Sequence, residues 1–140
     1  MNKVIAIANQ KGGVGKTTTA VNIAASLAAT KRRTLLVDLD PQGNATTATG
    51  VDNLNSKTLY SHYFEKTPIN KCIQKTKDNY DVIPGSEELI ALEVSIRSDG
   101  NQAFLSKSLK DLESNYDYTI IDTPPTLNQL TIEGLLCASG

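Results

Sequence analysis

The sequence predicts an α/β fold in which helices cover both faces of a doubly wound, mostly parallel sheet. Short apolar runs, such as residues 4–8 and 34–37, are continuous rather than alternating, which is typical of parallel strands buried on both faces. Between these runs, apolar residues recur at helical spacing. Alternation of strands and helices favours a parallel sheet, whose ligands bind beyond the carboxyl ends of the strands.

The first part of the chain is expected to form two strands joined by one helix. Residues 4–8 form the first strand and run directly into a cluster of glycines. Residues 17–30 have alanines on their apolar face, and alanine both favours helix and permits close packing on a sheet. Residues 34–37 form the second strand, which ends before Pro41 because proline interrupts regular pairing.

The middle of the chain gives weaker signals. Residues 42–55 are rich in Gly, Asn, Thr and Ala with little periodicity, which indicates a mobile or ligand-ordered segment rather than a packed element. This composition fits a switch-like loop. Residues 59–74 contain Pro68 and predict only short helical turns, to which no function can be assigned.

The remaining elements continue the strand and helix alternation. Residues 80–83 predict a third strand closed by a Pro-Gly turn, and residues 118–121 predict a fourth strand that presents Asp122 at its end. Lys107 and Lys110 are expected on the solvated side of a helix. The expected helices span residues 87–96, 102–113 and 127–138.

The length of 140 residues fits one domain over residues 1–140, and no repeat or linker divides it. The pattern stops after a helix, where the next strand would ordinarily follow. We therefore expect the C-terminally truncated part of a larger domain. Such a part would have an unpaired sheet edge and an exposed apolar helix face, with a risk of misassociation.

Charge and cysteine content narrow the possible function classes. The formal net charge of −1 provides no overall basic field that would attract nucleic acid. Cys72 and Cys137 lack CxxC spacing and His62 is the only histidine, so neither a zinc site nor a disulfide framework is indicated. Reduced, buried or half-buried thiols are expected, and with no apolar stretch long enough to span a bilayer they predict a cytoplasmic protein.

A glycine-rich phosphate loop (P-loop) is the strongest functional signal. Glycines allow backbone N–H groups to point inward at a phosphate, and the N-terminus of the following helix favours negative charge. Lys16 is expected to reach the β and γ phosphates, Thr17 to complete the Mg²⁺ shell and Thr18 to add a phosphate contact. A merely tight turn would not need two lysines and two threonines, although Gln10 replaces the usual first glycine. The loop predicts ATP and Mg²⁺ binding in a P-loop NTPase type of fold. Its residues are Lys11, Gly12, Gly13, Val14, Gly15, Lys16, Thr17 and Thr18.

Carboxylates follow two of the predicted strands. Asp122 has the position of an acid that holds Mg²⁺ through a water, although a carboxylate there can also serve as a turn or helix-cap residue. Asp38 and Asp40 close the second strand, where Pro41 bends the chain. The residues alone leave the roles of these two aspartates open.

Three segments, residues 9–19, 35–46 and 120–125, resemble the amino-terminal half of the ParA family of partition ATPases. This family belongs to the deviant-Walker group, which also includes MinD, nitrogenase iron protein and arsenical-pump ATPases. The Asp-Pro-Gln-Gly-Asn run of residues 40–44 is similar to partition members, whereas MinD-like proteins usually lack it.

The resemblance implies a Mg²⁺-dependent ATPase that works as a dimerisation switch in chromosome or plasmid partitioning. Lys11 would be the signature lysine that reaches the partner's phosphates in an ATP-dependent homodimer. Asp40 would orient the attacking water, Asp38 would support Mg²⁺ and the first switch, and residues 122–125 would sense the γ-phosphate. Lys11, Lys16 and Asp40 are thus the implied catalytic residues.

The same resemblance implies the partners of the protein. A ParB-type protein would stimulate hydrolysis, and nonspecific DNA would bind through a C-terminal part that these 140 residues lack. The implied location is the nucleoid in the bacterial cytoplasm, without membrane association.

Three alternatives remain at this point. A truncated nucleotide-binding module without turnover is the first, and a MinD-like division-site ATPase is the second, although the amphipathic membrane tail that it needs is not in this sequence. A P-loop metabolic ligase or transferase is the weakest, because the Gln-Gly-Asn match at residues 42–44 argues against it.

Overall fold

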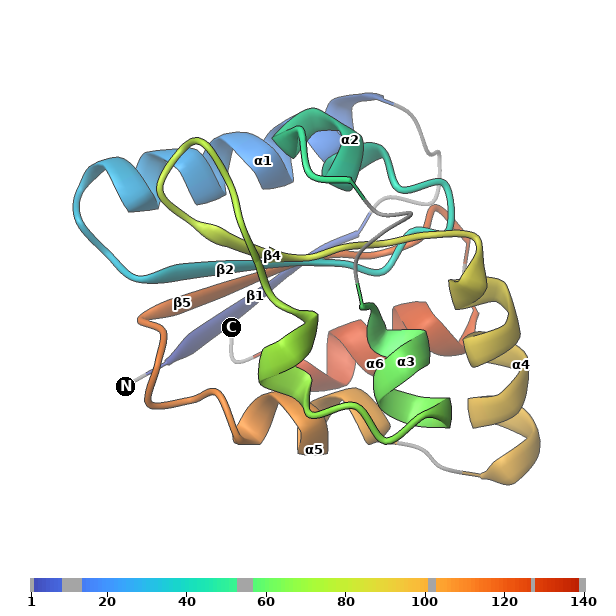
Figure 1. Ribbon diagram of the computed structural model, residues 1–140. Helices are drawn as coiled ribbons and strands as arrows, with labels where there is room; N and C mark the ends of the chain where they lie inside the picture. Colours follow the sequence, from blue (N-terminus) through green and yellow to red (C-terminus); the bar gives the residue numbers. More distant parts are fainter. Residues whose placement is uncertain (1, 9–13, 53–56, 101–102, 127, 139–140) are drawn as a thin grey trace.

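A five-stranded sheet lies between two helical layers in the computed structural model, which describes residues 2–8, 14–52, 57–100, 103–126 and 128–138 (Figure 1). The strands are β1 (Lys3–Ile7), β2 (Thr34–Asp38), β3 (Gln74–Lys75), β4 (Asp81–Ile83) and β5 (Tyr118–Asp122). The helices are α1 (Val14–Ala29), α2 (Asn44–Thr49), α3 (Leu59–Phe64), α4 (Glu88–Asp99), α5 (Phe104–Lys110) and α6 (Gln129–Cys137), with a 3₁₀ turn η1 (Ile69–Cys72) after α3.

The order of the strands confirms the predicted doubly wound, mostly parallel sheet. It is β1-β5-β2-β4-β3, in which only the two-residue edge strand β3 runs antiparallel to its neighbour. The register pairs Asp122 with Ile7 on one side and with Asp38 on the other. The carboxyl ends of the three strands β1, β5 and β2 therefore meet at one edge.

Alternate residues of the strands supply two separate cores. Leu36 of β2 faces α1, where the small side chains of Ala20 and Ala24 are fully buried and let the helix approach the sheet closely. The opposite layer consists of α3, α4, α5 and α6 (Figure 1). Leu35 and Val37 face this layer, which packs large leucine and isoleucine side chains from all four helices. Burying one such side chain contributes roughly 1.5–3 kcal/mol, so this second layer carries much of the packing energy.

The prediction of a mobile loop over residues 42–55 is wrong for α2. This short helix packs on α1 and buries Ala45, Thr46 and Thr49. Left-handed glycines flank it, with φ of 65° at Gly43 and 79° at Gly50. Its sequence is poor in strong helix formers, so contacts with the rest of the fold hold it. Residues 53–56 of the predicted loop lie outside the described residues.

Several smaller predictions are confirmed. Lys107 and Lys110 are exposed on α5, Cys72 is buried, Cys137 is half-buried, and both cysteines are free. In the described part of the chain β1 pairs with β5 alone, and α6 exposes the side chains of Ile132, Leu135 and Leu136. No helix among the described residues is long and apolar enough to cross a membrane.

Candidate functional site

The first turn of α1 meets the carboxyl end of β5 at the edge where the strands converge. Lys16 Nζ forms an ion pair with Asp122 Oδ1, and Thr17 Oγ1 lies 3.5 Å from Asp122 Oδ2. The ion pair is closed to solvent, because Lys16 is 4% exposed and Asp122 is 0% exposed. Three residues predicted from two distant motifs are therefore in direct contact.

The environment of Asp122 opposes its negative charge. Burial raises the pKa of this carboxyl group, while the Lys16 ammonium lowers it. A buried ion pair is weak evidence for stability, because desolvation can exceed the attraction, and perturbed carboxyl groups in such places are candidates for function.

Hard oxygen ligands suit Mg²⁺, and this corner of the molecule supplies two of them. They are the Thr17 hydroxyl and the Asp122 carboxylate, and Mg²⁺ usually completes its shell with waters and phosphate oxygens. Among the residues that the structure describes, no group of three or more His, Cys, Asp or Glu side chains could hold a metal ion. The donor set fits Mg²⁺ held together with a nucleotide rather than a closed metal centre.

Asp38 lies beside Asp122 in the sheet but has different partners. Its Oδ1 accepts the Asp40 N–H at 3.0 Å, and its Oδ2 accepts the Thr46 N–H at 2.9 Å and the Thr46 hydroxyl at 2.7 Å. Burial raises the pKa of Asp38 to about 6, against the lowering effect of these hydrogen bonds. Asp38 therefore fixes the start of α2 to the end of β2.

Asp40 stands at the turn that leaves β2. It is 4% exposed, and its Oδ1 accepts the Gln42 N–H at 3.0 Å, which is a hydrogen bond typical of an Asx-turn. Burial is the main cause of the raised pKa of Asp122, and the charge of Asp40 adds to it.

The chain that follows Asp122 is tied to the neighbouring strands. Thr123 donates both its N–H, at 3.2 Å, and its hydroxyl, at 2.7 Å, to the carbonyl oxygen of Ile7. Leu39 N–H donates to the carbonyl oxygen of Asp122 at 2.9 Å. These bonds lock the ends of β1, β5 and β2 together, so the three loops share one rigid base.

Comparison with known proteins identifies the family. A protein-family model described as an AAA domain matches residues 2–140. The chain belongs to this family. It is 46% identical over 142 residues to the chromosome partitioning protein ParA of Myxococcus xanthus. The alignment covers 99% of this chain and 50% of that protein. The predicted resemblance to ParA-type ATPases is thereby confirmed.

Two further proteins resemble this AAA-domain chain. The chromosome-partitioning ATPase Soj of Thermus thermophilus is 41% identical over 136 residues, covering 97% of this chain and 51% of Soj. A crystal structure of cobyrinic acid a,c-diamide synthase from Mycobacterium smegmatis, with a bound ATP analogue and magnesium, has a TM-score of 0.93 and 36% identity. That match covers 99% of this chain and 57% of the synthase. This chain thus spans about half the length of the curated relatives named here.

The start of the phosphate loop in this AAA-domain chain lies outside the described residues. Lys11, Gly12 and Gly13 fall there, as does the side chain of Val14, so the role of Lys11 as a signature lysine stays a prediction. Gly15 and Thr18 are exposed at the start of α1. Together with Thr17, Thr18 borders a hollow of about 450 Å³ between α1 and α2. The loop threonines thus face open space beside α2.

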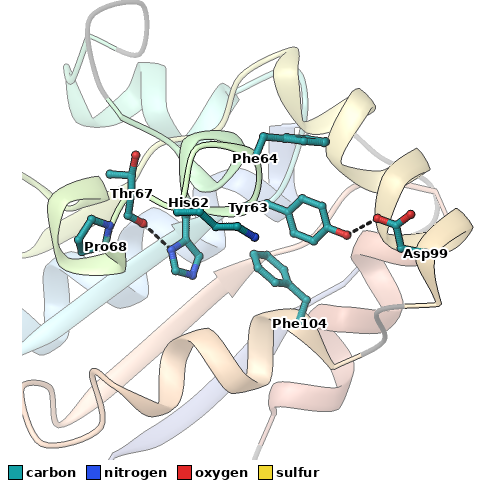
Figure 2. Close-up of a pocket in the computed structure, with 8 residues that line it drawn as sticks. His62, Tyr63, Phe64, Thr67, Pro68, Asp99 and Phe104 are labelled. Atoms are coloured by element: carbon teal, nitrogen blue, oxygen red, sulfur yellow. Dashed lines mark hydrogen bonds between the residues drawn. The ribbon is translucent and has the colours of Figure 1, made fainter.

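A second hollow, of about 600 Å³, lies in the opposite helical layer (Figure 2). Aromatic rings from α3 and α5 line it, and its polar groups pair with one another: His62 Nδ1 lies 2.7 Å from the Thr67 carbonyl oxygen, and Tyr63 donates to Asp99 at 2.6 Å (Figure 2). Of the residues predicted for phosphate or metal, none that the structure describes lines this hollow. The chemistry predicted from the sequence therefore does not lie here.

Sequence reasoning missed four residues that the AAA-domain fold uses. Thr46 and Gly85 link the loops at the site through a hydrogen bond. Glu93 and Glu133 are buried carboxylates of the helical layer, and Glu133 accepts the N–H groups of Ala103 at 2.8 Å and Leu105 at 3.0 Å. Glu133 thereby caps α5. A Pro-Gly pair after a strand was a signal for Gly85, whereas nothing in the pattern of α6 indicates that its glutamate is buried.

Proposed function

We propose that this chain is the phosphate-binding part of a Mg²⁺-dependent ATPase that acts as a dimerisation switch in DNA partitioning. The observation that carries the proposal is the buried contact of Lys16 with Asp122, beside the Thr17 hydroxyl. Phosphoryl transfer requires a cation, a carboxylate and a hydroxyl placed close together. This is because its catalysis depends almost entirely on positioning and on stabilisation of charge.

Each residue of the site has a distinct role in this proposal. Lys16 provides a positive charge for the phosphates, and its burial makes that charge act more strongly than it would in water. Thr17 and Asp122 would hold Mg²⁺ through their oxygens, and the ion would supply positive charge to the phosphates. Asp40 orients the attacking water, and Asp38 holds the turn that carries Asp40.

The wider role rests on the relatives and on the family resemblance. The relatives named ParA and Soj are described as chromosome partitioning proteins. By analogy we assign to this protein an ATP-dependent homodimer in which Lys11 reaches the partner's phosphates. We also assign to it stimulation by a ParB-type protein and nonspecific DNA binding through sequence beyond these residues. Its proposed location is the cytoplasmic nucleoid. Residues 1–140 are proposed to belong to one domain.

A second candidate function is an ATP-dependent ligase. The match to the cobyrinic acid a,c-diamide synthase structure, at 36% identity over 99% of this chain, favours it. Both functions use the same phosphate loop, so the phosphate site alone does not separate them. The 46% identity to the Myxococcus protein makes partitioning the first choice.

The decisive experiment is steady-state phosphate release from Mg-ATP, with and without DNA. Wild type is compared with Lys16→Ala and Asp40→Ala, and Lys107→Ala is the control because it removes an exposed lysine far from the site. Turnover that the first two variants abolish and the control retains would support an ATPase. Nucleotide binding without turnover would leave a binding module, and turnover that requires glutamine and a carboxylic acid substrate would favour the ligase.

A further inference from the structure

Two turns that follow neighbouring strands are joined through one hydroxyl group. The Gly85 N–H, just after β4, donates to Thr46 Oγ1 at 2.8 Å. The Thr46 hydroxyl in turn donates to Asp38 Oδ2, at the end of β2, at 2.7 Å. A threonine hydroxyl has a single proton, so this arrangement uses it for Asp38 and uses a lone pair for Gly85. No apolar side chain can replace it.

The linked groups are withdrawn from water. Asp38 is 0% exposed and Thr46 is 1% exposed, and Gly85 is buried. Hydrogen bonds in such surroundings are stronger than in water, and leaving one partner unsatisfied is correspondingly costly. Asp38 also accepts the N–H of Asp40. A continuous chain of hydrogen bonds therefore leads from the β4 turn to the residue proposed to orient the attacking water.

Gly85 also packs directly against the backbone of the β2 turn. A Cβ atom at Gly85 would lie 2.8 Å from Asp38 Cγ and 2.9 Å from the carbonyl oxygens of both Asp38 and Asp40. Two of these three neighbours are backbone atoms, which cannot swing aside as a flexible side chain can. The two turns thus touch along their main chains as well as through Thr46.

We infer that Thr46 is a positioning residue that locks the Asp38–Asp40 turn to the Pro84–Gly85 turn, so that both turns hold Asp40 as one unit. This inference rests on the proposed ATPase function, because Asp40 matters only if water is activated there. It also assigns a purpose to the β4 turn, which neither the phosphate loop nor the aspartate motifs include.

Hydrogen exchange tests the lock without any need for turnover. Thr46→Val keeps the side-chain shape but removes the hydroxyl, and Thr46→Ser retains the hydroxyl. Thr49→Val is the matched control, because it removes a second buried hydroxyl of α2 that bonds to the Thr46 carbonyl oxygen and not to Asp38 or Gly85. Exchange at the amides of residues 85–87 should rise by about tenfold or more in Thr46→Val only. Unchanged exchange there, or an equal rise in Thr49→Val, overturns the lock.

Kinetics then test the positioning role. We expect Thr46→Val to lower kcat by about tenfold or more while KM for ATP stays within about threefold, because the phosphate loop is untouched. Thr46→Ser should restore kcat, and Thr49→Val should retain it. Faster exchange with unaltered kcat in Thr46→Val overturns the positioning role. A wild-type protein without turnover contradicts the proposed ATPase instead, and the exchange experiment still decides whether Thr46 couples the turns.

Discussion

Asp38 and Asp122 are the same residue type at the same register of two adjacent strands, and they differ only in what surrounds them. Both end a parallel strand, both are 0% exposed, and burial raises the pKa of both. Asp122 faces the Lys16 ammonium and the Thr17 hydroxyl, whereas Asp38 accepts hydrogen bonds from neutral groups of its own loop. The position in the sheet brings a carboxylate to the site, and its partners decide what it does there.

The two aspartates differ in the kind of partner that each carboxylate has. The partners of Asp38 are backbone amides and a hydroxyl that the fold holds in place, and its support of Mg²⁺ stays a prediction. The partners of Asp122 are side chains, and both side chains are groups that bind phosphate or Mg²⁺ in phosphoryl transfer. We therefore expect substitution of the two aspartates to have different effects on nucleotide binding.

The largest expected effect is on nucleotide binding. Asp122→Asn removes the charge of the carboxylate proposed to bind Mg²⁺, and it should weaken Mg²⁺-dependent binding of an ATP analogue by about 100-fold, as for loss of one charge-assisted contact in a buried site. Asp38→Asn should change this affinity by no more than about fivefold, because no charged partner is lost. Fluorescence titration with and without Mg²⁺ measures both. Equal losses in the two variants would show that the partners do not divide the roles.

The next effect is on stability. Asp38 faces three hydrogen-bond donors. An asparagine at this position offers them one acceptor oxygen and turns its NH₂ group toward at least one donor. Asp38→Asn should therefore lower the free energy of unfolding by about 2–3 kcal/mol. Gly85→Ala should lower it by about 1–3 kcal/mol through overpacking. Urea unfolding measures both, with the exposed Asp78→Asn as control. An unfolding free energy that Asp38→Asn leaves unchanged would contradict the structural role.

The sequence could predict the parts of the site that depend on local pattern. The phosphate loop, the strand ends and the aspartates were found in this way, and the contact of Lys16 with Asp122 follows from their convergence at one sheet edge. The helix α2 could not be found, because its stability comes from a residue outside the helix. This residue is Asp38, which accepts the N–H of Thr46 eight residues further along the chain. Weak local propensity is overridden here by tertiary contacts.

The burial of Glu133 in α6 shows a second limit of prediction from the sequence. Glu133 is 1% exposed, while Ile132, Leu135 and Leu136 of the same helix are exposed by 40–57%. A helix is ordinarily expected to turn its apolar side chains inward, and its periodicity gives no sign that a glutamate is buried instead. Glu133 is buried because it caps α5, a partner far away in sequence that hydropathy does not reveal.

A smaller effect is expected from pH. The pKa of Asp38 is raised from its ordinary value of 3.8 to about 6, so the folded chain binds more protons than the unfolded chain between these values. The stability due to this group is therefore greater at pH 5 and falls as pH rises, by about 1 kcal/mol between pH 5 and 7. The difference in unfolding free energy between wild type and Asp38→Asn isolates this contribution. A difference that grows with rising pH would contradict the raised pKa.

Effects of a size similar to that of pH are expected at two buried tyrosines, which extend the comparison. Among the described residues, Tyr80 has a buried hydroxyl without a hydrogen-bond partner, whereas Tyr116 donates to Asp81 Oδ2 at 2.7 Å. Tyr80→Phe should raise the free energy of unfolding by about 0.5–1 kcal/mol, because it removes an unsatisfied polar group, and Tyr116→Phe should lower it by about 1–2 kcal/mol. Urea unfolding of both variants measures the contrast. If Tyr80→Phe loses as much stability as Tyr116→Phe, a buried water satisfies the Tyr80 hydroxyl. In that case too, the partners of the buried hydroxyl, rather than its burial, decide whether the substitution raises or lowers the free energy of unfolding.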